Sequence, residues 1–104
     1  PYRAATPDKP LDLLSCGPLT FSAPDEEAFP CLRIAKDCAA AGGTACAIMN
    51  GANEVAVAQF LRGEIGFNDI ARRVERALSR VAVKYQPSLG DILEADRLGR
   101  EAAR

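Results

Sequence analysis

The sequence contains no histidine, no tryptophan and one methionine, and only 6% of its residues are aromatic. Histidine is the commonest general base in enzymes, so its absence excludes a self-contained hydrolase built on a Ser-His or Cys-His pair. Alanine is abundant instead, which suits closely packed helices. With 104 residues, the chain has the length of one domain and can hold a real core without disulfide staples.

The chain also lacks an excess of charge of either sign and a long apolar run. Its 13 basic and 14 acidic side chains give a net charge of −1, and no basic block is present. Nucleic-acid binding rests mainly on Lys and Arg that neutralise phosphates, so we expect no nucleic-acid partner. No run approaches the ~20 apolar residues that span a bilayer, so we expect no membrane partner either.

The four cysteines form no Cys-x-x-Cys pair, and without histidine their spacing argues against a zinc site. Cys31 and Cys38 would lie two helical turns apart, at ~10 Å, which is too far for a disulfide. We therefore expect free thiols that act as small apolar side chains, in a cytoplasmic protein.

We expect residues 1–24, at the N-terminus, to form an extended arm. Residues 1–10 carry three prolines, which favour an extended linker. The segment from Leu11 to Pro24 either wraps on the helices or adds an edge strand to something outside the chain. Because Pro1-Tyr2-Arg3 has neither a starting Met nor a signal pattern, we expect the chain to be a piece excised from a longer protein.

The spacing of apolar residues in residues 25–104 predicts an all-α domain with a four-helix bundle-like fold. The first helix falls within residues 25–43, with Pro30 at its first helical position, and Gly42-Gly43 ends it. Thr44 is a candidate N-cap for a second helix that reaches Arg62. The apolar positions expected in the first helix are Cys31, Ile34, Ala35 and Cys38.

Two further helices complete the predicted domain. Asn68 is a candidate cap for the third, whose apolar stripe is the cleanest in the chain. Ser88 with Asp91 resembles a capping box at the start of the fourth. The two apolar stripes are Ile70, Val74, Ala77, Leu78 and Val81, followed by Leu89, Ile92, Leu93, Leu98 and Ala102.

The dipeptide Asn50-Gly51 usually marks a hairpin turn. Here it lies among apolar residues at helical spacing, and no partner strand precedes it, so we place it within a helix. Glycine costs about 1 kcal/mol against alanine inside a helix. Its presence therefore predicts that another backbone passes close to Gly51.

Asn50, Asn53 and Glu54 share one face of that helix. Two amides and one carboxylate could position a ligand or a hard cation, but a single carboxylate is too few for a good metal site. We interpret the three residues as a structural polar network that links the helix to its surroundings. No residue of the chain is assigned a catalytic, cofactor-binding or metal-binding role.

Several segments together resemble one known family. "PLDLLSCGPLTFSAPDEEAFPCLRIA", "AGGTACAIMNGANEVAVAQFL", "IGFNDI" and "SLGDILEADRLGREAAR" are similar, in this order, to the C-terminal region of 1-deoxy-D-xylulose 5-phosphate reductoisomerase. The resemblance runs through nearly the whole chain. It departs at Gly51, where alanine is usual in the family.

The resemblance implies an NADPH-binding domain, a catalytic domain with a divalent metal, and a C-terminal helical bundle, of which only the bundle and its linker are present here. The family's enzyme converts 1-deoxy-D-xylulose 5-phosphate to 2-C-methyl-D-erythritol 4-phosphate in isoprenoid biosynthesis. It uses NADPH and Mg²⁺ or Mn²⁺ and is a homodimer. The cofactor and metal motifs lie upstream of Pro1, so we expect no cofactor in this chain and no activity from it alone.

Two other readings remain open. The chain could be a stand-alone helical module that binds a partner protein through an exposed apolar patch. It could also be a helical enzyme that uses the face with Asn50, Asn53 and Glu54. The first alternative predicts a start codon near the Pro1 codon, and the second predicts an activity that depends on Glu54.

Overall fold

The computed structural model describes Ala4 and residues 7–104. The beginning of the predicted arm, residues 1–3 and 5–6, lies outside these described residues. The described chain forms four α-helices and no β-strand, which confirms the all-α prediction. The helices are α1 (Pro30–Ala41), α2 (Ala45–Leu61), α3 (Asp69–Arg80) and α4 (Leu89–Ala102).

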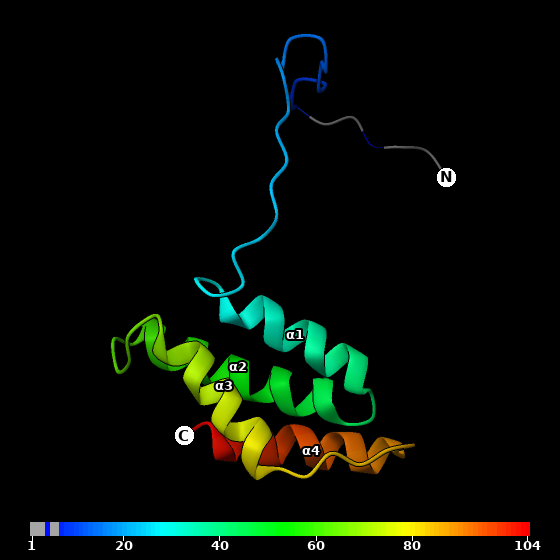
Figure 1. Cartoon of the computed structure of the whole chain (residues 1–104), viewed down its shortest axis with the longest axis vertical. Helices are drawn as coiled ribbons and strands as arrows, with labels where there is room; N and C mark the ends of the chain where they lie inside the picture. Colours follow the sequence, from blue (N-terminus) through cyan, green and yellow to red (C-terminus); the bar gives the residue numbers. More distant parts are fainter. Residues whose placement is uncertain (1–3, 5–6) are drawn as a thin grey trace.

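Helix α2 lies at the centre of the helical domain. It packs against each of the other three helices, while α1 and α4 lie on its opposite sides and α3 crosses them (Figure 1). The buried residues of α2 recur every three or four positions along the helix, so they share one broad face. Small side chains fill much of the core, so the helices approach closely. The core residues are Ile34, Cys38, Ala45, Ile48, Ala52, Ala71, Val74, Ala77, Ala95 and Ala103.

The crossing of α2 and α4 depends on two glycines. A Cβ atom on Gly51 would lie 2.6 Å from the carbonyl oxygen of Asp96 in α4. A Cβ atom on Gly99 would lie 2.5 Å from the carbonyl oxygen of Ile48 in α2. Real Cβ atoms do not come this close to backbone oxygen. The prediction that a second backbone passes close to Gly51 is therefore confirmed, and α4 supplies that backbone.

Only part of the apolar stripe predicted on the fourth helix lines the core: Ala102 packs against it, whereas the large side chains near the start of the helix do not. Leu89 is 72% exposed and Leu93 is 62% exposed. The face that packs inward carries Ala95 and Gly99 instead. A leucine could not fit where two helix backbones approach so closely, so the small residues face α2 and the large ones turn outward. Cys31, expected on the core face of α1, is likewise exposed.

The predicted helix ends are confirmed in part. Pro30 starts α1, and Ser88 and Asp91 form the reciprocal capping box of α4. Thr44 and Asn68 occupy N-cap positions, but neither side chain caps its helix. The hydroxyl of Thr44 instead accepts a hydrogen bond from the N–H of Lys84, and this ties the α3–α4 connection to the start of α2.

Before α1, residues 7–25 form an arm that runs away from the helices (Figure 1). Every residue from 7 to 25 is exposed, including Leu14 at 97% and Phe21 at 92%. The alternative in which residues 11–24 wrap on the helices is therefore wrong. Residues 26–28 then form a turn, in which the Asp25 carboxylate accepts hydrogen bonds from the N–H groups of Glu27 and Ala28.

Candidate functional site

The polar face of α2 is joined to α4 by an arginine. Arg100 donates from its guanidinium to Glu54 in α2 and to Asp96 one turn before it in α4, at 2.7 Å in each case. Asp96 and then Glu54 raise the pKa of Arg100 above its usual range. Asn50 donates to the other oxygen of Glu54 at 3.3 Å. All the charges in this group are therefore paired with one another across the two helices.

Asn53 lies apart from this group, although the sequence places it one turn from Asn50. It lines a hollow of about 590 Å³ between the start of α1, the middle of α2 and the start of α3. The hollow is partly apolar, with Phe29, Val57, Phe67 and Ile70 among its walls. The face predicted from spacing thus divides between an ion-pair group and a mixed hollow.

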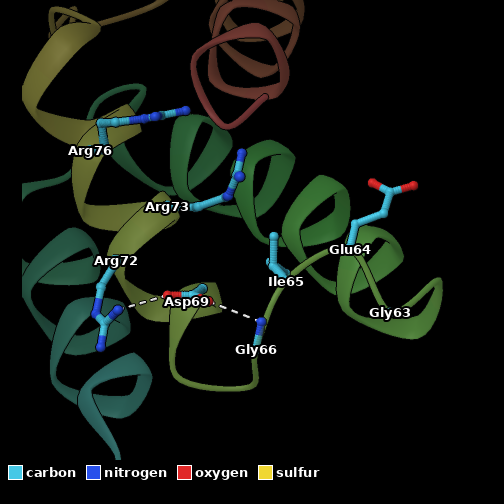
Figure 2. A pocket seen from close by; sticks show the side chains of 8 residues that line it. All are labelled: Gly63, Glu64, Ile65, Gly66, Asp69, Arg72, Arg73 and Arg76. Carbon is cyan, nitrogen blue, oxygen red and sulfur yellow. Dashed lines mark hydrogen bonds and ion pairs between the residues drawn. The ribbon is translucent and has the colours of Figure 1, made fainter.

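A second hollow of about 690 Å³ lies between the α2–α3 connection and α3. Figure 2 shows Arg72 beside Asp69, with which it forms a 2.7 Å ion pair. Arg73 donates to the main-chain oxygen of Ala103, and Arg76 donates to that of Ala102. Arg73 and Arg76 thus commit part of their guanidinium groups to holding the end of α4.

The residues present do not fit the cofactor and metal that the resemblance implies. Among the residues that the structure describes, no three His, Cys, Asp or Glu side chains are grouped so that they could hold a metal ion. No Gly-x-Gly-x-x-Gly segment opens any of the helices. The buried thiol of Cys38 is a poor nucleophile, because burial raises its pKa and the nearby Cys46 and Asp37 raise it further.

Nor does the described structure contain a helix that is both long and apolar enough to cross a membrane.

The fold and the site together define a class of protein: a small all-α domain, built around one central helix, that follows an extended arm with exposed apolar side chains. Comparison with known proteins gives the family. A family model described as the DXP reductoisomerase C-terminal domain matches residues 1–102, and the chain belongs to that family.

Curated relatives named 1-deoxy-D-xylulose 5-phosphate reductoisomerase match almost the whole chain. The protein from Synechococcus sp. is 50% identical over 100 residues, which are 96% of this chain and 26% of that protein. The one from Pseudomonas paraeruginosa is 48% identical over 103 residues, or 99% of this chain and 26% of that protein. The chain thus spans about a quarter of the length of these relatives.

A solved structure shows the same fold. The 1-deoxy-D-xylulose 5-phosphate reductoisomerase from Zymomonas mobilis, in complex with NADPH, superposes with a TM-score of 0.83 at 42% identity. The superposition covers 97% of this chain and 27% of that one. It therefore includes most of the arm as well as the helices.

Sequence reasoning missed the residues that connect α4 to its neighbours. Arg100 lies in a run of charged residues of the kind that usually faces solvent, yet it pairs with a carboxylate 46 positions earlier. Arg73 and Arg76 likewise lie among charged residues, yet both donate to the end of α4. The i, i+4 spacing of Asp96 and Arg100 was a signal for their own pair, but no local pattern indicates a partner on another helix.

Proposed function

We propose that this chain is the C-terminal part of a 1-deoxy-D-xylulose 5-phosphate reductoisomerase. In this proposal the whole enzyme converts 1-deoxy-D-xylulose 5-phosphate to 2-C-methyl-D-erythritol 4-phosphate for isoprenoid biosynthesis. It does so in the cytoplasm as a homodimer, with NADPH and Mg²⁺ or Mn²⁺. The observation that carries the proposal is that nearly the entire chain matches one quarter of these enzymes, in sequence and in fold.

The role that we assign to the chain within that enzyme is architectural. Residues 1–24 would serve as the connecting arm, and residues 25–104 as the helical domain that packs against the catalytic domain. NADPH and the metal would be held by the other domains: the described residues contain no group of three His, Cys, Asp or Glu side chains that could hold a metal, and the sequence contains no Gly-x-Gly-x-x-Gly segment. Exposed apolar side chains on α4, such as Leu89 and Leu93, supply surface for domain packing.

A domain exchange tests the proposal. The last quarter of the Zymomonas mobilis enzyme is replaced by this chain, and NADPH oxidation is followed with 1-deoxy-D-xylulose 5-phosphate and Mg²⁺ or Mn²⁺. We expect an active enzyme. We expect no turnover from the 104-residue chain alone, nor from the Zymomonas enzyme without its last quarter. An inactive but folded exchange protein would contradict the architectural role, and saturable NADPH binding by the chain alone would contradict the absence of a cofactor site.

Gene context separates this proposal from a stand-alone interaction module. We expect the open reading frame to continue upstream of the Pro1 codon through a catalytic region to a Gly-rich βαβ segment. A start codon close to the Pro1 codon would instead favour a small protein that binds a partner. The family match would then describe ancestry alone.

We also propose that Asn50, Asn53 and Glu54 serve stability and not chemistry. Glu54 holds α4 through its ion pair with Arg100, whereas Asn53 lines the hollow between α1, α2 and α3. We expect Glu54→Gln to lower the unfolding temperature and leave kcat of the whole enzyme unchanged. The matched control is Glu64→Gln, since Glu64 pairs only with the nearby Arg62 and bridges no helices. A lower kcat with unchanged stability in Glu54→Gln would favour the reading of this face as a catalytic site.

A further inference from the structure

The arm contains a segment with the pattern of a β-strand. Leu19, Phe21 and Ala23 alternate with Thr20 and Ser22. This period of two puts the apolar side chains on one face of an extended chain and the hydroxyls on the other. Prolines stand directly before and after the five residues, at positions 18 and 24, and in sheets proline occurs on edge strands, at the first residue of a strand or at bulges. Five residues is a typical strand length.

The segment has no partner within the described chain. Leu19 is 67% exposed and Phe21 is 92% exposed. Between residues 17 and 24, no backbone N–H or C=O group makes a hydrogen bond to any described residue. The backbone is extended, so a row of donors and acceptors and a row of apolar side chains both face solvent. An exposed strand of this kind is a template for pairing with another sheet.

The helices of this chain do not supply the missing partner. The arm leads away from them (Figure 1). The superposition on the Zymomonas mobilis enzyme covers 97% of this chain, or about 101 of 104 residues (0.97 × 104), so it includes the arm. The matched part of that enzyme therefore includes a counterpart of the arm, and it makes up 27% of a chain nearly four times as long as this one. In a polypeptide of that length, about three quarters of the residues lie outside the matched part and are available as a partner.

We propose that residues 19–23 add as an edge strand to a β-sheet in the preceding part of the same polypeptide. The inference rests on the proposed function, because it needs the longer enzyme. Backbone hydrogen bonds would join the arm to the sheet, and the face with Leu19 and Phe21 would pack on apolar side chains. Covalent continuity favours the same polypeptide over a second copy, because it keeps the effective concentration high.

Residue-resolved hydrogen exchange on the full-length enzyme tests the inference. In an edge strand, N–H groups of alternate residues point toward the neighbouring strand and the others point to solvent. We therefore expect either the odd or the even amides of residues 19–23 to exchange about 100-fold more slowly than in an unstructured peptide. Fast exchange at all five amides, or equal protection of all five, would overturn the proposal.

Two neighbouring substitutions provide a matched pair. Phe21→Asp puts a charge on the face that packs, and we expect it to abolish the alternate protection. Ser22→Asp puts the same charge on the solvent face, and we expect it to leave the pattern intact. Loss of protection in both variants or in neither would contradict the assignment of the two faces.

Dilution shows whether the sheet belongs to the same polypeptide or to a second copy, and an activity assay separates the strand proposal from the proposed function. Alternate protection should persist when the enzyme is diluted below its dimerisation constant, and loss on dilution would assign the sheet to a second copy and overturn the proposal. Reductoisomerase activity is measured on the same sample. An active enzyme with five fast amides would overturn only the strand. An inactive protein with alternate protection would overturn only the proposed function.

Discussion

Replacing Gly99 by alanine should test whether close backbone contact holds α2 and α4 together. A Cβ atom at this position would lie 2.5 Å from the carbonyl oxygen of Ile48, and the next two nearest atoms also belong to the Ile48 backbone. No flexible side chain can move aside. To reach an ordinary contact of 3.4 Å, α4 must move away from α2 by up to 0.9 Å (3.4 − 2.5).

Two opposing effects set the change in the free energy of unfolding. Overpacking in a well-packed core costs about 1–3 kcal/mol, and the rigid neighbours at Gly99 place this site at the upper end. The better helix propensity of alanine offsets about 1 kcal/mol of this cost. We therefore expect Gly99→Ala to lower the free energy of unfolding by about 2 kcal/mol, and the melting temperature by roughly 8–16 °C in a domain of this size.

Gly90 provides the control within the same helix. The nearest heavy atom to a Cβ there is the Ser88 hydroxyl oxygen at 3.7 Å, so Gly90→Ala gains helix propensity without a clash. We expect it to be stabilising by up to about 1 kcal/mol. Thermal and urea unfolding, followed by circular dichroism at the helix band, compare the two variants with the parent chain. If Gly99→Ala were as stable as Gly90→Ala, the close crossing would be wrong.

Three further predictions concern other contacts. Thr44→Val leaves the N–H of Lys84 without its acceptor and should cost about 1–2 kcal/mol, whereas Thr44→Ser should cost less; urea unfolding of both variants checks this. Hydrogen bonds from the Lys84 ammonium and then from Ser88 hold the pKa of Asp91 well below its usual range. The stabilisation that ionised Asp91 provides should therefore be present above about pH 4 and be lost as the pH falls further. Stability should fall less steeply with pH in Asp91→Asn. Urea unfolding midpoints measured between pH 2 and 6 would show the difference. A thiol reagent should label Cys38 far more slowly than the exposed cysteines, because Cys38 is buried and its thiol pKa is raised; equal rates at all four thiols would contradict its burial.

Local patterns in the sequence were enough for the helices and several of their ends. The spacing of Ile70, Val74 and Ala77 predicted the buried face of α3, and Pro30 predicted the first residue of α1. Such signals are carried by residues within one or two turns of each other, where steric limits and backbone hydrogen bonding act whatever the rest of the chain does. The glycine at position 51 even predicted a close neighbour, although not which one.

Only the tertiary structure decided which faces meet. Apolar content placed Leu89 and Leu93 inside, yet α4 presents Ala95 and Gly99 to α2, because a backbone crossing this close has no room for leucine. The sequence alone predicted amphipathic helices within residues 25–104, behind an extended arm. The packing of those helices determined that Arg100 would meet Glu54, because the two residues come together only once α2 and α4 have crossed.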